Sequence, residues 1–166
     1  MDALEVIKLR RSIRVYENKP ISKDVLERVI DVARFSPTAR NVQPWEFIVV
    51  TKKETLAKIS QLTDNGKFIK DASVCIFIFC AATKYYLEDG CSATVNILNA
   101  ATALGIGSCW VAGDKKDYTE EMRKILSVPV DFKLVSLIAL GYPQDKNSFK
   151  LIEKRALNDL IHWEKF

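Results

Sequence analysis

The sequence predicts an α+β fold in which helices pack on a small sheet. Short apolar runs of strand length alternate with longer segments of helical periodicity, and the composition, 48% hydrophobic and 28% charged, is that of an ordinary globular protein. A length of 166 residues suits one compact domain with one core. Because no repeat or linker rich in glycine, serine or proline divides the chain, we expect a single domain over residues 1–166.

The expected helices are defined by their N-caps and apolar stripes. Asp2 can cap a first helix that leads directly to a cluster of arginines. Ser22 can cap a second helix, which Pro37 stops because the residue before a proline is pushed out of helical geometry. Further helices are expected at residues 53–62 and 119–126.

The longest expected helix spans residues 84–104 and ends at Gly105. It has almost no polar face after its first turns, so it must be covered on all sides, either at the centre of the domain or in a subunit interface. Its alanines and Gly90 would let another helix approach closely.

Four apolar runs predict the strands of the sheet, at residues 47–51, 74–79, 108–113 and 132–143. Cys75 and Cys80 lie an odd number of residues apart in the second run, so they should point to opposite faces. Both are expected to be small buried apolar residues, as free cysteines usually are.

The composition excludes several classes of protein. A net charge of +4 is too diffuse to indicate nucleic acid, and four cysteines without a CxxC pair indicate neither zinc nor a disulfide framework. The apolar runs are too short to cross a bilayer, and the first helix carries acids, so we expect a cytoplasmic protein. His162, the only histidine, is expected to pack or cap. With so few reactive side chains, either the protein is no enzyme or an organic cofactor performs its chemistry.

A first candidate site is the run "RRSIR", in which Arg10, Arg11 and Arg14 surround Ser12. The guanidinium fork matches phosphate oxygens in bidentate fashion, and a serine hydroxyl adds a short hydrogen bond. The run therefore suits a terminal phosphate monoester. The alternative is a set of solvated charges that favour the negative end of the first helix.

A second candidate is the polar segment "FSPTARNVQPWEF", in which Thr38, Asn41 and Gln43 lie between two stiffening prolines. Side-chain amides offer both a donor and an acceptor, so they could pair with a heterocycle edge such as a pyrimidine-dione. An ordinary capped turn, with Trp45 anchoring the next strand, is the alternative.

Together with "LGIGSCWVAG", "LIALGYP" and the terminal "HWE", these motifs resemble the FMN-dependent nitroreductase family nearly end to end. The resemblance implies a three-layer α-β-α fold with a mixed, mainly antiparallel sheet. It also implies a homodimer with FMN in the subunit interface, and neither nucleic acid nor membrane as a partner.

The resemblance further assigns roles to individual residues. Arg10, Arg11, Ser12 and Arg14 would bind the ribityl phosphate and the pyrimidine side of the flavin, and Lys154 and Arg155 would complete the phosphate site. A backbone amide at Ala112 or Gly113 would face flavin N5, with glycine permitting close approach. The remaining implied flavin contacts are Pro37, Thr38, Ala39, Asn41, Gln43, Asn65, Trp110 and Val111, and the partner subunit would contribute part of this isoalloxazine pocket.

The implied activity is a ping-pong transfer of electrons from NADH or NADPH, through flavin N5, to a small acceptor such as a nitroaromatic or a quinone. No catalytic side chain and no metal are expected. The alternatives are a specialised flavin enzyme of the same fold, for reductive dehalogenation or flavin fragmentation, and a non-catalytic anion- or RNA-binding domain. Residues 62–73 and 113–119 are short, which implies an open face over the flavin.

Overall fold

The computed structural model describes residues 2–166 and has a four-stranded sheet in the order β1-β2-β4-β3. Neighbouring strands are antiparallel throughout, and the one parallel pairing is an isolated bridge between Ser12 and Ser108. The strands are β1 (Trp45–Val50), β2 (Val74–Ala81), β3 (Gly107–Ala112) and β4 (Phe132–Gly141). The predicted strands are thus present, but β1 and β2 are longer than expected because they pair along their whole length, from Trp45 with Cys80 to Val50 with Cys75.

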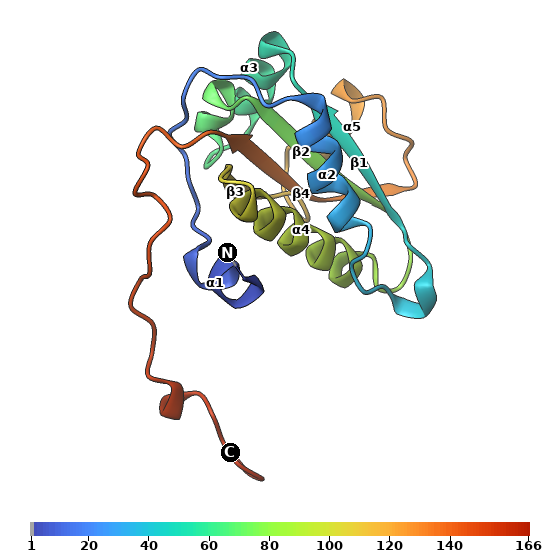
Figure 1. The fold of residues 1–166 in the computed structure, drawn as a ribbon. Helices are drawn as coiled ribbons and strands as arrows, with labels where there is room; N and C mark the ends of the chain where they lie inside the picture. The colour runs from blue at the N-terminus through green and yellow to red at the C-terminus, as the bar shows by residue number, and fades with distance from the viewer. Residues whose placement is uncertain (1) are drawn as a thin grey trace.

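Helices cover both faces of the sheet (Figure 1). They are α1 (Ala3–Leu9), α2 (Lys23–Ala33), α3 (Lys53–Leu62), α4 (Tyr86–Ala103) and α5 (Thr119–Ile125), with short 3₁₀ turns η1 (Ala39–Asn41), η2 (Lys67–Asp71) and η3 (Leu157–Asp159). The α2 and α4 side encloses one apolar cluster, which includes Val29 and Ile97, and the α3 and α5 side encloses another, which includes Leu56 and Met122. The predicted three-layer α-β-α arrangement is confirmed.

Side-chain hydrogen bonds explain two of the helix boundaries, whereas Ser22 lies at the N-cap of α2, as predicted, but its side chain makes no capping hydrogen bond. Asp2 caps α1 through a reciprocal capping box with Glu5, as its position predicts. Helix α2 ends at Ala33, earlier than Pro37 requires, because the Ser36 hydroxyl donates to the Ala33 carbonyl at 2.7 Å. Cys75 and Cys80 lie in opposite apolar clusters, which confirms the predicted alternation, and burial is the main cause that raises the pKa of Cys80 to about 12.

Helix α4 is covered by the sheet and by α2, but not on all sides. Val95 is 44% exposed, and Cys91 is half-buried on the same side of the helix. The glycine in this helix also differs from its predicted role. Gly90 lets a strand approach and not another helix, because a Cβ built there would lie 2.6 Å from Val135 Cγ2 in β4.

Replacing Gly90 with alanine should therefore destabilise the protein, although alanine favours helices by about 1 kcal/mol. Overpacking against the stiff Val135 side chain costs about 1–3 kcal/mol, so the net loss should be about 1 kcal/mol in urea unfolding. A Val135→Ala background removes the two Cγ atoms at 2.6 and 2.9 Å and leaves only Cβ at 3.0 Å, so the same G90A change should cost clearly less there. A stabilising effect in both backgrounds would contradict the contact.

Candidate functional site

The arginine motif lies in the extended segment that follows α1 and runs beside the edge strand β3. The Ile13 N–H donates to the Ser108 carbonyl at 2.9 Å, and the Ile13 side chain is buried. The buried Tyr16 hydroxyl donates back to the Ile13 carbonyl at 2.6 Å. These contacts fix the backbone at one buried residue, so that its neighbours Ser12 and Arg14 are held at the surface.

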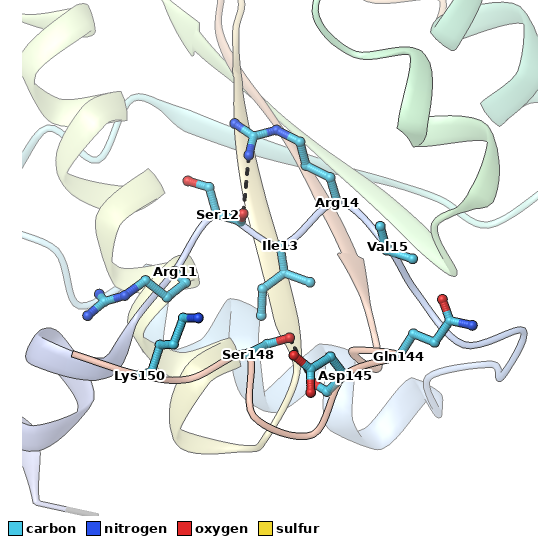
Figure 2. Close-up of a pocket in the computed structure, with 9 residues that line it drawn as sticks. All are labelled: Arg11, Ser12, Ile13, Arg14, Val15, Gln144, Asp145, Ser148 and Lys150. Atoms are coloured by element: carbon cyan, nitrogen blue, oxygen red, sulfur yellow. Dashed lines mark hydrogen bonds between the residues drawn. The ribbon is translucent and has the colours of Figure 1, made fainter. Parts of the chain in front are cut away.

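Two adjoining cavities flank this segment, each of about 610 Å³. The first is lined by Arg11, Ser12, Arg14 and, from the chain after β4, by Asp145, Ser148 and Lys150 (Figure 2). In Figure 2 the Arg14 side chain turns back over the segment, where its guanidinium donates to the Ser12 carbonyl at 3.3 Å.

The second cavity lies between the end of α1 and the C-terminal tail. It is lined by Arg10, Arg11, Ser12 and Lys154, together with apolar residues of both segments. The structure thus brings together four residues that were expected to share one phosphate. Arg155 lines neither cavity, because its Nη2 donates to the Asp159 carbonyl at 3.0 Å within the tail.

These cations have no anionic partners of their own. Within residues 2–166, no carboxylate forms an ion pair with Arg10, Arg11, Arg14, Lys150 or Lys154. The Arg11 guanidinium donates to the carbonyls of Lys8, at 2.7 Å, and of Arg10, while its buried Nε has no partner. An unpaired buried donor among unpaired cations fits an anion that accepts several hydrogen bonds, as a phosphate does.

A smaller hollow of about 130 Å³ follows the outer edge of β3. Arg14 lines it as well as the first cavity, so the two are continuous around that side chain. The other lining residues are Asp64, Asn65, Cys109, Trp110, Val111, Ala112, Lys116 and Tyr118. Asn65 is thus beside β3, although it follows α3 in the chain.

The backbone amide of Ala112, at the end of β3, faces this outer edge. Hydrogen bonds alternate along an antiparallel edge strand, and the Gly113 N–H donates inward to the Val135 carbonyl at 3.2 Å. The N–H and C=O of Ala112 therefore point away from β4. The Tyr118 hydroxyl donates to the Ala112 carbonyl, and burial, followed by the Asp64 carboxylate, raises the pKa of Tyr118, which keeps the donor protonated.

The sequence-based role of Gly113 needs correction. Its N–H is engaged by Val135, so of the two predicted amides only that of Ala112 is available to a ligand. Its missing side chain faces β4 and not the hollow, since a Cβ there would lie 2.8 Å from the Val135 carbonyl carbon and 2.9 Å from the Ser136 nitrogen. The absence of a side chain at Gly113 therefore permits a close approach between β3 and β4, and not between β3 and a ligand.

The predicted amide segment lies elsewhere. Pro37, Thr38, Ala39, Asn41 and Gln43 line none of the three hollows, and η1 and α1 lie near opposite ends of α4 in Figure 1. Asn41 and Gln43 are exposed, whereas the Thr38 hydroxyl donates to Asp89 in α4. Trp45 is the first residue of β1 and is buried in the core. This agrees with the alternative interpretation, in which Trp45 anchors the strand after an ordinary turn.

Sequence reasoning missed several residues at these sites. Lys116 and Tyr118 follow β3 in an irregular turn, Asp64 follows α3, and no local pattern distinguishes them. Lys150 lies in a tail whose basic character is visible in the sequence, which is a usable signal. Asp89 is concealed within the apolar helix α4.

The remaining candidates carry no chemistry in the described chain. His162 neither packs in the body nor caps a helix, because it lies in the exposed tail with its ring 4.3 Å from that of Phe166. Across residues 2–166, no three His, Cys, Asp or Glu side chains cluster as metal ligands. No helix of those residues has the length and apolarity that a membrane crossing requires.

Comparisons with known proteins agree with this fold. A model of the nitroreductase family matches residues 7–73 and 63–142. An Archaeoglobus fulgidus protein, provisionally named as an NADH dehydrogenase or NAD(P)H nitroreductase, is 38% identical over 173 residues, which cover 99% of each chain. An FMN reductase [NAD(P)H] of Bacillus subtilis is 28% identical over 88% of this chain and 69% of its own.

Among solved structures, an FMN-dependent nitroreductase of Clostridium difficile superposes with a TM-score of 0.89 and 28% identity, over 98% of this chain and 99% of that one. The layered fold is thus shared with an FMN-dependent nitroreductase. The chain belongs to the nitroreductase family, which confirms the family predicted from the motifs.

Proposed function

We propose that this protein is an FMN-dependent oxidoreductase that passes electrons from NADH or NADPH to small acceptors such as nitroaromatics or quinones. The relatives named as NAD(P)H nitroreductase and FMN reductase support this activity. The observation that carries the proposal is the group of unpaired cations, with the orphaned Arg11 Nε among them, next to an edge strand with an outward amide.

The residues present fit FMN in parts. Arg10, Arg11, Ser12 and Lys154 would hold the phosphate, since they line one cavity and no carboxylate neutralises them. Arg14 and Asn65 would bind the pyrimidine side of the ring along the β3 edge. When bound, FMN supplies the chemistry by accepting a hydride from the nicotinamide and releasing electrons to the acceptor.

The protein's own residues would stabilise the reduced flavin and leave the site open to solvent. Positive charge from Arg14 would favour the anionic reduced form of a flavin held in this hollow, and the outward N–H of Ala112 would be available to donate a hydrogen bond to it. Residues 113–118 form a short turn over this hollow, so solvent can supply protons without a catalytic side chain. The short turn also favours a general reductase over a specialised flavin enzyme that needs an inserted lid.

We also propose that two copies of the chain complete each site. Asn41 and Gln43 lie in and just after η1, near the end of α4 that is opposite to α1 and the arginine cavities (Figure 1). They would therefore contact the flavin that the arginines of the partner subunit bind. Several exposed apolar residues would be covered in such a dimer: Leu4 and Ile7 of α1, Phe35 and Val42 beside η1, Val95 of α4, and Trp163 of the tail. The free cysteines at positions 75, 80, 91 and 109 suit the reducing cytoplasm.

The proposal is tested by the colour and redox behaviour of the purified protein. We expect one FMN per chain, anaerobic bleaching by NADH or NADPH, and reoxidation by a nitroaromatic or a quinone with parallel-line ping-pong kinetics. A colourless protein that takes up no added FMN would contradict the assignment. In that case salt-sensitive binding of RNA would favour the non-catalytic alternative.

A further inference from the structure

The loop between α2 and β1 has an unusual backbone. Arg40, Asn41 and Gln43 all have positive φ angles, of 56°, 56° and 52°, although none is glycine. Left-handed backbone is unfavourable for residues with a side chain and persists only where the surroundings hold it. Something outside the loop must therefore stabilise the shape that presents Asn41 and Gln43.

The stabilising contacts come from α4. Asp89 accepts a hydrogen bond from the Thr38 hydroxyl at its Oδ2, at 2.9 Å, and another from the Ala39 N–H at its Oδ1, at 3.1 Å. The Thr38 oxygen accepts in turn from the Gln43 N–H at 3.2 Å, which closes the loop on itself. One carboxylate therefore ties both the start and the end of the strained segment to the helix.

The burial of Asp89 makes this arrangement informative. The residue is 5% exposed, and within residues 2–166 no Lys, Arg or His forms an ion pair with it. A buried carboxylate without a cation is costly, and only hydrogen bonds and its place in the first turn of α4 compensate. An apolar residue in its place would leave the Thr38 hydroxyl and the Ala39 N–H without an acceptor, so the carboxylate is the group that holds the loop in this form.

We infer that Asp89 is a positioning residue, which holds residues 38–43 in the strained form that lets Asn41 and Gln43 bind the flavin. This inference rests on the proposed function for its purpose. The latch itself, from Asp89 to Thr38 and Ala39, is a separate property of the fold.

The test uses Asp89→Asn, because an amide has nearly the same shape but keeps only one accepting oxygen. The control is Glu88→Gln, which removes the same charge from the same helix turn at an exposed side chain. Two quantities are measured on the full-length purified protein: the dissociation constant for FMN, and the rate of trypsin cleavage after the exposed Arg40. Cleavage at the exposed Lys115–Lys116 turn serves as an internal reference.

For D89N we expect cleavage after Arg40 to accelerate roughly 10- to 100-fold, which corresponds to the loss of one buried hydrogen bond to a charged group. Cleavage at the reference turn should change little, whereas the thermal midpoint should fall by several degrees, because global unfolding breaks the same hydrogen bond. The FMN dissociation constant should rise at least about tenfold. E88Q should behave as the wild type in every measurement.

A second variant protects the test against misfolding. Thr38→Val removes the same hydrogen bond from the loop side together with the one from the Gln43 N–H, so cleavage after Arg40 should accelerate in this variant as well. Because the two substitutions share one hydrogen bond, the D89N/T38V double variant should cleave more slowly than the product of the two single effects. Equal Arg40 cleavage in D89N and the wild type would overturn the latch. Faster cleavage with an unchanged FMN dissociation constant would overturn its positioning role. If the wild type takes up no FMN, the proposed function fails and the positioning role fails with it, while the cleavage comparison still decides the latch.

Discussion

Replacing Arg10 with glutamate is expected to abolish the retention of FMN during purification. Arg10 lines the cavity between α1 and the tail, and among residues 2–166 its guanidinium forms no hydrogen bond or ion pair that the substitution would break. The change removes a charge-assisted hydrogen bond and places a carboxylate against the phosphate. Together these effects cost about 3–4 kcal/mol, so the dissociation constant should rise about 100- to 1,000-fold.

Titration of FMN and of riboflavin, followed by flavin fluorescence, measures this effect. Because riboflavin has no phosphate, R10E should lose most of the wild-type preference for FMN while its weak binding of riboflavin is kept. Arg28→Glu is the matched control, since Arg28 is an exposed arginine of α2 with the same change of charge. An R10E protein that remained yellow with one FMN per chain would contradict the assignment of Arg10 to the phosphate of FMN.

Gly113→Ala is expected to be the most damaging small substitution in the site. The new Cβ would lie 2.8 Å from the Val135 carbonyl carbon and 2.9 Å from the Ser136 nitrogen, and backbone atoms cannot rotate aside. The end of β3 must therefore move away from β4, which breaks the 3.2 Å hydrogen bond from the Gly113 N–H to the Val135 carbonyl. We expect a loss of about 2–3 kcal/mol in the free energy of unfolding.

The same displacement moves the Ala112 amide, so FMN affinity should fall together with stability. Urea unfolding and FMN titration of one preparation measure both. Gly105→Ala is the control, because Gly105 has a φ of +71° and no heavy atom within 4 Å of the added Cβ. It should lose about 1 kcal/mol from backbone strain alone and bind FMN normally. Equal losses in the two variants would contradict the steric explanation.

The fold was largely predictable because local sequence specifies local structure. Apolar stripes and N-caps located the helices, and short apolar runs located the strands to within a few residues. The errors occur where a partner element sets the boundary. Strand β1 begins at Trp45 because β2 extends to pair with it, and a single strand carries no signal for the length of its neighbour.

The candidate site was predictable in its residue types but only partly in its arrangement. Arg10, Arg11, Ser12 and Lys154 meet in one cavity, as the motif and the family resemblance indicate. The same reasoning assigned Gly113 to the ligand, whereas the structure assigns it to packing between β3 and β4. A glycine indicates close approach, but the sequence does not say which group approaches.

The sequence by itself indicated the helices, the strands and the cationic character of the N-terminal segment, because these depend on residue type and on spacing within a few residues. Only the tertiary structure decided that the Tyr118 hydroxyl donates a hydrogen bond to the Ala112 carbonyl. It also decided that Asp89 accepts a hydrogen bond from Ala39, which lies 50 residues before it in the chain. Such contacts join segments that no local pattern relates, and they form only after the chain has closed around its core.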